Sequence, residues 1–277
     1  MIARALTIAG SDSGGGAGVQ ADLKTFTVFG VYGMSAITAL TAQNTRGVAG
    51  IYAVPADFVR QQIDAVLTDM GVDAVKTGML LNASVIREVA AALRQHRVSR
   101  LVVDPVMLAG TGAALLETNA CDALIRDLLP LATLVTPNIH EAEALTGLQI
   151  TSVAEMGQAA RQLCEMGAAA CLIKGGHLSG TDAVDVLFDG TDLLELGTPR
   201  LAAPHTHGTG CQLSAAITAA LARGSSLVEA VRQAKIFISR AIVHGLALGS
   251  GAGPANALAW LEQDEKDWAS QVWQRKL

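Results

Sequence analysis

Short apolar runs alternate with segments of helical periodicity along most of this 277-residue chain, and nearly every run ends in glycine, proline or polar residues. Repeated strand–loop–helix units of this kind predict a parallel sheet with helices on both faces. We therefore expect an α/β fold, a three-layer α/β/α sandwich around a central, mostly parallel sheet. The pattern predicts strands at 3–9, 35–41, 51–54, 74–76, 101–103, 134–135 and 170–173, and a hairpin of 184–188 with 193–196. It predicts helices at 19–29, 55–69, 83–95, 121–129, 156–166 and 227–246, and one through Glu141 and Glu143.

The composition is that of an α/β enzyme with many tight turns, because 51% of the residues are hydrophobic, 16% are charged and 28 are glycines. No linker divides the chain. We expect a single domain over residues 1–277, with a core at about 3–260 and a polar, partly helical C-terminal tail.

Charge and hydropathy exclude several classes of partner. A formal charge of −5 without a basic cluster argues against nucleic acid. No apolar run reaches the roughly 18 residues of a membrane span, and the first apolar run is too short for a signal peptide. Cys121, Cys164, Cys171 and Cys211 form no CxxC pair and no zinc spacing. These features predict a cytoplasmic protein with reduced thiols.

The stretch 206–221, THGTGCQLSAAITAAL, places two glycines, a threonine and a cysteine at the start of a buried helix. Helix N-termini offer unpaired N–H groups and the positive end of the helix dipole, and glycines let an anion approach the backbone. We expect an anion site here, at which Cys211 ionises more easily than a free thiol. A glycine turn that caps a core helix is the alternative.

The first strand runs into the glycine loop GSDSGGGAG. Its spacing matches neither the GxGxxG of dinucleotide-binding folds nor the GxxxxGK[ST] of the P-loop. It favours a backbone that a small ligand can approach, with Asp12 and Asp22 available for hydrogen bonds. Gln43 and Asn44 follow the next strand, and a carboxamide there suits a heteroaromatic ring because it offers both donors and an acceptor.

Several polar residues directly follow predicted strands. Ligands of parallel sheets bind beyond the carboxyl ends of the strands, so these side chains should share one cleft. Together they suit phosphoryl transfer: Asp104 and Glu141 as carboxylates for Mg²⁺, partly through water, and Lys174 as a cation for phosphate. The backbone of the 208–211 loop would stabilise the transferred group, and Cys211 would act as base. The residues that follow strand ends are Met79, Asp104, Asn138, Glu141 and Lys174.

Motifs in order from residue 5 to about residue 245 resemble a known family, the bacterial hydroxymethylpyrimidine/phosphomethylpyrimidine kinases of thiamine biosynthesis, within the ribokinase-like superfamily. The segments that carry the resemblance are GSDSGGGAGVQADLK, TAQNT, KTGM, DPVM, TPNIHEAE, IKGGH and THGTGC followed by SAA. The resemblance implies a ribokinase-like sandwich with Mg²⁺ and ATP. It also implies two phosphorylations, of 4-amino-5-hydroxymethyl-2-methylpyrimidine and then of its monophosphate.

The resemblance also implies roles for individual residues. The pyrimidine would be held by Gly10, Asp12, Ala17, Asp22, Gln43, Met79 and Val106. ATP would be bound by Asp104, Asn138, Glu141, Lys174, Thr209 and Lys235, with Mg²⁺ at Asp104 and Glu141. The residues with catalytic roles would be Lys174, Gly208, Thr209, Gly210 and Cys211. Among them, Cys211 would occupy the position of the base, which is an aspartate in the sugar kinases of the superfamily.

Two residues depart from the family pattern. His140 stands where proline is common, and Gln212 stands where threonine is common and could change how the loop is capped. His205 and His207 flank the loop, and we expect both to be structural.

Other functions remain open from the sequence. A pyridoxal or pyridoxine kinase shares the superfamily and the loop, and Gln43 could face a pyridine. A thiol-dependent hydrolase or redox protein would use Cys211 with a histidine partner, and a non-catalytic pyrimidine sensor would have lost its phosphate-binding groups. We expect a homodimer and a stand-alone enzyme, since no thiamine-phosphate synthase domain follows in this sequence.

Overall fold

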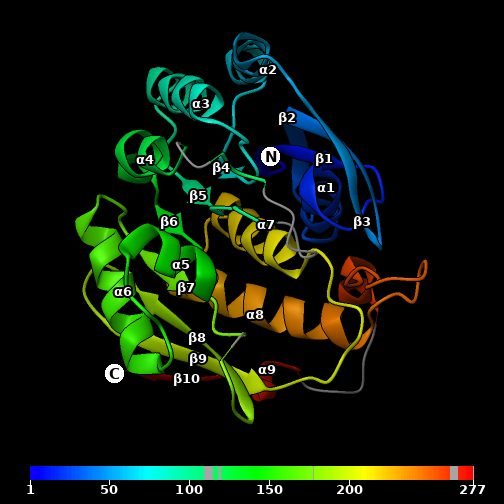
Figure 1. The fold of residues 1–277 in the computed structure, drawn as a ribbon, viewed down its shortest axis with the longest axis vertical. Helices are drawn as coiled ribbons and strands as arrows, with labels where there is room; N and C mark the ends of the chain where they lie inside the picture. The colour runs from blue at the N-terminus through cyan, green and yellow to red at the C-terminus, as the bar shows by residue number, and fades with distance from the viewer. Residues whose placement is uncertain (109–114, 118–119, 177, 263–267, 277) are drawn as a thin grey trace.

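The structure is a computed structural model that describes residues 1–108, 115–117, 120–176, 178–262 and 268–276. Its described part is built on a 10-stranded sheet with the order β10-β9-β8-β7-β6-β5-β4-β1-β2-β3 (Figure 1). Pairing is parallel from β2 through β1 and β4 to β7, and antiparallel at both edges. The predicted mostly parallel sheet is confirmed. The strands are β1 (Arg4–Asp12), β2 (Tyr32–Asn44), β3 (Gly47–Ala53), β4 (Ala74–Thr77), β5 (Leu101–Val103), β6 (Leu134–Val135), β7 (Cys171–Ile173), β8 (Asp182–Phe188), β9 (Leu193–Pro199) and β10 (Trp273–Lys276).

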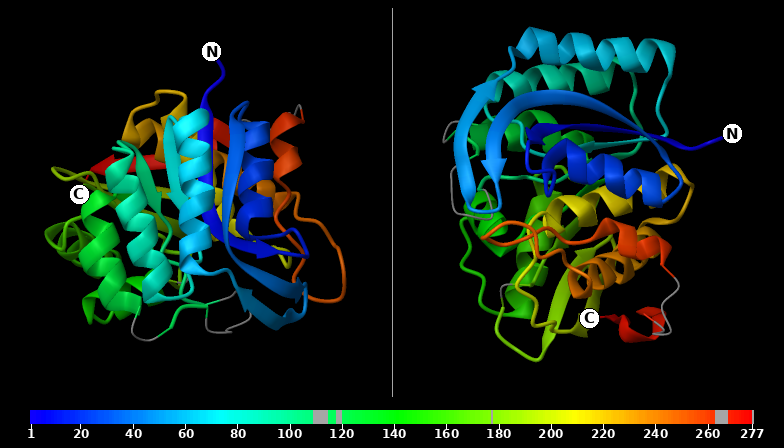
Figure 2. Two further views of the ribbon diagram at one scale, coloured as in Figure 1. Left: turned by 90° about the horizontal axis from the view of Figure 1, so that it is seen from above. Right: turned by 90° about the vertical axis from the view of Figure 1, so that its right-hand side faces the viewer.

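Helices cover both faces of the sheet, as the two views of Figure 2 show. One layer contains α2 (Ala56–Asp69), α3 (Ala83–Gln95), α4 (Ala120–Ala123), η1 (Leu124–Leu128), η2 (Leu129–Leu131), α5 (Ile139–Thr146) and α6 (Val153–Glu165). The other contains α1 (Gly18–Val28), α7 (Thr209–Ala222), α8 (Leu227–Val243) and η3 (Ala257–Leu261). The short helix α9 (Trp268–Gln271) precedes β10. The described chain is therefore a three-layer sandwich.

The two faces of the sheet differ in side-chain size. Toward α2 and α3 the central strands present Leu6, Ile8 and Val75, whereas toward α7 they present Ala5 and Ala74. Every residue of α7 from 212 to 222 is buried, and many of them are alanines. A helix that is buried all round needs close neighbours on every side, and small side chains let its backbone approach the sheet. This packing holds the N-terminus of α7 against the middle of the sheet.

Three elements differ from the sequence prediction. β2 continues to Asn44, so that Gln43 lies within the strand and not beyond it. The predicted helix at 121–129 is divided into α4, a π turn and a 3₁₀ turn that contains Pro130, because proline cannot continue an α-helix. The end of the C-terminal tail forms β10 at the edge of the sheet, which local sequence did not predict.

Among the described helices, none is both long and apolar enough to cross a membrane.

A missing side chain on β9 makes room for β10. Trp273 pairs with Gly197, and a Cβ at that glycine would lie 2.2 Å from Cζ2 of the indole. The indole N–H donates to Asp182 at 3.2 Å. The indole of Trp273 therefore packs directly against the backbone of Gly197.

We predict that Gly197→Ala lowers the free energy of unfolding by about 1–3 kcal/mol, because the added methyl overlaps the indole. In a Trp273→Ala background the same change should cost much less. Urea denaturation of the four proteins of this cycle gives the coupling. Equal costs in both backgrounds would show that β10 does not depend on this contact.

Candidate active site

The predicted site residues gather at one edge of the sheet. β1 and β4 to β7 are parallel, so their carboxyl ends lie together. The strand order also reverses at β1, which has β2 on one side and β4 on the other. In open α/β sheets ligands bind in the crevice outside the carboxyl ends at such a reversal. The same crevice receives the first residues of α1 and α7, whose helices pack against each other.

The two helices that enter the crevice begin without a side-chain cap. The N-cap residues of α1 and α7 are Ala17 and Gly208, and neither helix has a capping side-chain hydrogen bond. By contrast, α3, α5, α6 and α8 are each capped by an asparagine or serine side chain. Uncapped N-termini leave N–H groups for a ligand, and the helix dipole favours an anion there. The anion site predicted at 208–211 therefore has suitable geometry.

The glycine loop and the loop before α7 touch through their backbones. Gly208 has φ of 79°, and a Cβ there would lie 1.8 Å from the carbonyl oxygen of Gly16. A Cβ on Gly18 would lie 2.3 Å from the carbonyl oxygen of Gly10. Both glycines are required by close approach as well as by positive φ.

Cys211 is partly exposed at the start of α7, and its ionisation differs from the prediction. Burial raises the pKa of the thiol to about 11, although Lys76 and the Gly18 backbone N–H favour the thiolate. Asp22 and Asp104 add to the rise in pKa. The prediction of an easily ionised thiol was wrong, because the loss of hydration at this enclosed position outweighs the favourable charges.

Asp104 and Lys174 form the charged centre of the crevice. Nζ of Lys174 lies 2.9 Å from Oδ1 of Asp104 and 4.0 Å from Oε2 of Glu141. Ser214, on α7, donates to the second oxygen of Asp104 at 3.1 Å. Burial alone would raise the pKa of Asp104, but the charges of Lys174 and Lys76 outweigh it and lower this pKa. The structure thus brings three predicted residues together and adds Ser214.

Glu141 and Asn138 also form the capping box of α5. Asn138 Oδ1 accepts from the Glu141 backbone N–H at 2.9 Å, and Glu141 Oε2 accepts from the Asn138 backbone N–H at 2.8 Å. Burial raises the pKa of Glu141, and the nearby Lys174 opposes the rise. The capping box fixes the carboxylate at the edge of the crevice.

Asp104 and Glu141 are the carboxylates nearest to Lys174 in the crevice. In the part of the chain that the structure describes, no cluster of three or more His, Cys, Asp or Glu side chains could hold a metal ion. Mg²⁺ usually keeps several waters and binds one or two protein carboxylates together with phosphate oxygens. Two carboxylates, one of them already hydrogen-bonded on both oxygens, suit a magnesium ion bound partly through water.

Asp12 organises the glycine loop. Its carboxylate accepts hydrogen bonds from the backbone N–H groups of Gly14, Gly16 and Ala17 at 2.8 to 3.1 Å, and from Nε2 of His207 at 3.0 Å. Burial would raise the pKa of Asp12, but the bonds from His207, Ala17 and Gly14 lower it below its ordinary value. With its oxygens used in this way, Asp12 holds the loop that a ligand would meet.

Gln43, on β2, lies next to His207, which also contacts Asp12. Oε1 of the Gln43 carboxamide lies 3.2 Å from the Thr41 hydroxyl, and its Nε2 lies 3.4 Å from Nε2 of His207. His207 therefore contacts two predicted pyrimidine-binding residues, a role that local sequence did not indicate.

Met79 and Val106 belong to one small apolar cluster with Ala39, Leu81 and Leu115. Gly10 borders it, because a Cβ there would lie 3.0 Å from Sδ of Met79. This cluster is apolar, as the lining of a site for a heteroaromatic ring usually is.

Asp22 is placed differently from the prediction. It has no exposed surface, and its oxygens accept from Nζ of Lys76 at 2.7 and 2.8 Å and from Thr7 at 2.6 Å. Burial would lower the pKa of Lys76, but Asp22, Cys211 and Asp104 raise it, so the ammonium stays charged. Lys76 directly follows Ala74 and Val75 in a predicted buried strand, and a lysine at such a position could have indicated a buried ion pair. It was not recognised from the sequence alone.

The prediction that Lys235 contacts ATP does not fit the structure. Its amino group is buried and donates to Asp185 at 2.6 Å and to the Ala183 carbonyl at 3.0 Å. The other Asp185 oxygen accepts from the Gly175 N–H at 2.9 Å. Lys235 instead joins α8 to β8, and its ammonium group is already paired with Asp185.

The structure also shows the surroundings of Gln212 and His140, the two residues that depart from the family pattern. Gln212 does not cap the loop, because its Nε2 donates to the Ala255 carbonyl at 3.0 Å and holds the segment after α8. His140 is exposed on α5, with Nδ1 3.5 Å from Glu143. His205 accepts from the Gly253 N–H at 3.1 Å, as a structural histidine would.

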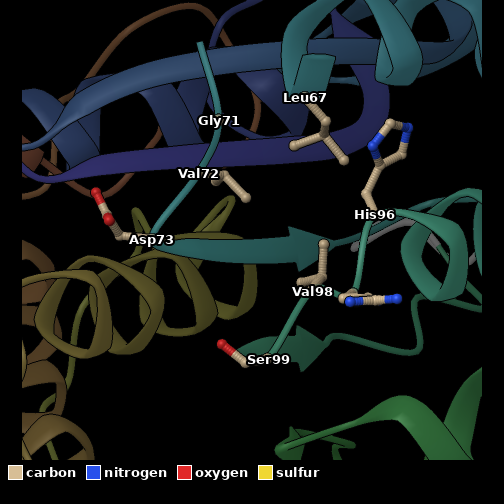
Figure 3. Close-up of a pocket in the computed structure, with 8 residues that line it drawn as sticks. Leu67, Gly71, Val72, Asp73, His96, Val98 and Ser99 are labelled. Carbon is tan, nitrogen blue, oxygen red and sulfur yellow. The ribbon is translucent and has the colours of Figure 1, made fainter. Parts of the chain in front are cut away.

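A separate hollow lies at the opposite edge of the sheet, where the chain enters β4 and β5 (Figure 3). None of its lining residues is a predicted site residue. Its polar groups are engaged locally, since Asp73 binds Arg4 and His96 binds Asp64. The lining residues are Leu67, Gly71, Val72, Asp73, His96, Arg97, Val98 and Ser99.

Known proteins share both the sequence and the fold. The chain is 49% identical over 260 residues to the hydroxymethylpyrimidine/phosphomethylpyrimidine kinase of Bacillus subtilis, with 94% of this chain and 96% of the relative covered. It is 54% identical over 251 residues to the thiamine biosynthesis bifunctional protein of Geobacter sulfurreducens, with 91% of this chain covered. The chain spans about half (51%) of the length of that bifunctional relative.

Solved structures agree. The pyridoxal kinase of Staphylococcus aureus, in complex with AMP-PCP and pyridoxal, has a TM-score of 0.91 at 36% identity, with both chains fully covered. The phosphomethylpyrimidine kinase of Clostridium difficile has a TM-score of 0.78 at 44% identity, covering 87% of this chain and 100% of that one. The family model described as phosphomethylpyrimidine kinase matches residues 12–256. The chain therefore belongs to the phosphomethylpyrimidine kinase family.

Proposed function

We propose that this protein transfers the terminal phosphoryl group of ATP to 4-amino-5-hydroxymethyl-2-methylpyrimidine and then to the resulting monophosphate, in thiamine biosynthesis. Family membership supports the choice of reaction. One observation in the structure supports this function most directly. Lys174 lies next to Asp104 and Glu141 on one side and to the uncapped start of α7 on the other. A Cβ on Gly210 would lie 3.4 Å from Nζ of Lys174, so the cation and the helix N-terminus can contact the same phosphate.

On the ATP side, Lys174 and the free N–H groups of α7 stabilise the charge of the transferred phosphoryl group. Asp104 and Glu141 would hold Mg²⁺ through its waters. The ion, when bound, neutralises phosphate charge and orients the phosphate chain. Asn138 stays engaged in its capping box and positions Glu141.

On the acceptor side, we propose Cys211 as the group that receives a proton. Because its pKa is about 11, only about one thiol in ten thousand is ionised at pH 7. The thiolate that does form is a correspondingly strong base, since basicity rises with pKa. A phosphate monoester, with a second pKa of about 6, needs no such base. The two phosphorylations should therefore depend on Cys211 to different degrees.

The structure supports the alternative functions to different degrees. The similarity to pyridoxal kinases supports a side activity on pyridoxal. Measuring kcat/KM for pyridoxal and for the hydroxymethylpyrimidine would show which acceptor the protein prefers. For a thiol hydrolase, the nearby histidine is directed elsewhere, since His207 contacts Asp12 and Gln43. For a sensor, the phosphate-binding groups should be lost, yet Asp104, Lys174 and Glu141 are together.

We also propose a cytoplasmic homodimer. The edge strand β3 carries no charged side chain and exposes Ile51 and Tyr52, a surface that protein association commonly covers. Light scattering of the purified protein measures the oligomeric state, and a monomer would contradict the proposal.

The direct test supplies purified protein with ATP, Mg²⁺ and the hydroxymethylpyrimidine. ADP release and mass analysis should reveal first the monophosphate and then the diphosphate. If neither product forms, the proposed function is wrong.

We predict that Cys211→Ala lowers the turnover of the alcohol acceptor by about 10²–10⁴-fold and that of the monophosphate much less, because only the alcohol must lose a proton. Each acceptor is assayed separately, with Cys164→Ala on α6 as the matched control. Equal losses for both acceptors would indicate that Cys211 positions the substrate and does not act as base.

The two lysines should behave differently. Lys174→Met should reduce kcat about a hundredfold or more, because a donor to the transferred phosphoryl group is lost. Lys235→Met should instead lower stability by about 3–5 kcal/mol, since Asp185 would be buried without its partner. Steady-state kinetics and urea denaturation of both variants separate the effects. A selective rise in KM for ATP in a fully stable Lys235→Met protein would restore the role that sequence predicted for Lys235.

A further inference from the structure

The hydrogen bonds around Gln43 determine how its carboxamide is turned. A carboxamide has a donor end and an acceptor end that exchange by a half-turn about the last side-chain bond, and the neighbouring groups decide between the two orientations. For Gln43 those neighbours are His207 on one side and Thr41 on the other.

His207 is constrained to be a donor at Nε2. That nitrogen lies 3.0 Å from Oδ2 of Asp12, and a carboxylate only accepts. Asp12 is held as a carboxylate by three loop N–H groups, and its pKa lies below its ordinary value despite burial, because of the bonds from His207, Ala17 and Gly14. The proton of His207 is therefore on Nε2, which faces both Asp12 and Gln43.

Thr41 is constrained to be an acceptor toward Gln43. Its hydroxyl has a single proton, which is donated to the Ser11 carbonyl at 2.9 Å. The hydroxyl oxygen can then only accept from the end of the carboxamide that lies 3.2 Å away.

Both neighbours require the same orientation. The N–H at Nε2 of His207, which Asp12 already accepts, still favours the amide oxygen of Gln43 over its N–H groups. The Thr41 oxygen, whose proton goes to Ser11, favours the amide nitrogen. As the structure places it, Gln43 has Nε2 3.4 Å from Nε2 of His207 and Oε1 3.2 Å from the Thr41 hydroxyl. This sets an N–H against an N–H, and a half-turn of the carboxamide removes that conflict. One N–H and one lone pair of Gln43 then remain for a ligand.

We propose that His207 and Thr41 are positioning residues that set the orientation of Gln43, and thereby the donor and acceptor pattern that the acceptor ring must match. The inference rests on the proposed function, since it concerns how the pyrimidine is chosen. An aminopyrimidine edge has an N–H donor next to a ring-nitrogen acceptor, which complements the free lone pair and free N–H of Gln43.

The backbone of His207 holds the ring in place independently of Asp12. Its N–H donates to the Gly253 carbonyl at 3.1 Å, and its carbonyl accepts from the Ala255 N–H at 3.2 Å. Its ring also lies against Gly16, where a Cβ would approach Cδ2 to 2.5 Å. His207 is thus fixed relative to both the glycine loop and the start of α7, so the orientation of Gln43 is coupled to the anion site.

The test compares two acceptors, the 4-amino-5-hydroxymethyl-2-methylpyrimidine and its analogue without the 4-amino group. The readout is the ratio of their kcat/KM values. The wild-type protein should prefer the amino compound about tenfold or more, as expected when a ligand group leaves a polar partner unpaired. His207→Leu and Thr41→Val should each reduce this preference to about threefold or less, whereas His207→Gln, which restores a side-chain donor, should keep most of it.

His205→Leu is the matched control, because His205 lies in the same loop but bonds the Gly253 N–H instead of Gln43. It should leave the ratio unchanged. If His207→Leu does not fold, Thr41→Val and His207→Gln still decide the question.

An unchanged ratio in His207→Leu and Thr41→Val, with both acceptors slowed equally, would overturn the inference and indicate a purely structural role. Failure of the wild-type protein to phosphorylate either compound would instead overturn the proposed function, so the two failures are distinguishable.

Discussion

The crevice depends on the meeting of two helix N-termini, backbone against backbone. Gly208 and Gly16 approach so closely that no side chain fits between them, and Gly18 makes a similar contact with Gly10. This contact is possible because the alanine-rich α7 packs tightly against the alanine face of the central strands. As a result, the start of α7 lies against the glycine loop. Asp12 already accepts hydrogen bonds from the N–H groups of Gly16 and Ala17 at the start of α1, so α7 is the helix whose N-terminus favours an anion there.

Buried charge is the other constraint, and it is met with lysine–carboxylate pairs. Lys76 pairs with Asp22, Lys174 with Asp104 and Lys235 with Asp185. A buried ion needs a partner because desolvation costs several kcal/mol. The pair of Lys174 is partly exposed at the crevice, so Lys174 can also contact a ligand, whereas the other two pairs are closed. Lys76 and Asp22 act on the site through space, by their opposite effects on the pKa of Cys211.

Relatives of this chain are named for different acceptors, the hydroxymethylpyrimidine and pyridoxal. The residues predicted to bind phosphate are backbone N–H groups, one lysine and two carboxylates. The residues predicted to bind the acceptor include Gln43 and the apolar pair Met79 and Val106. On these predictions, a change of acceptor would involve the carboxamide and the apolar cluster. The glycine loop, organised by Asp12, connects the two groups of residues.

The layered α/β architecture could be predicted from the amino-acid pattern, because hydrophobic periodicity and strand-end glycines are local. The shared edge of Asp104, Glu141 and Lys174 could be predicted as well, since carboxyl ends of parallel strands lie together. Motif resemblance then named the family. The folded structure was needed to show that Lys235 and Asp22 are closed in ion pairs, that His207 contacts Gln43, that the Cys211 thiol resists ionisation, and that the tail adds β10. These features depend on contacts between segments far apart in the chain and on the dehydration that such contacts impose, which no local pattern encodes.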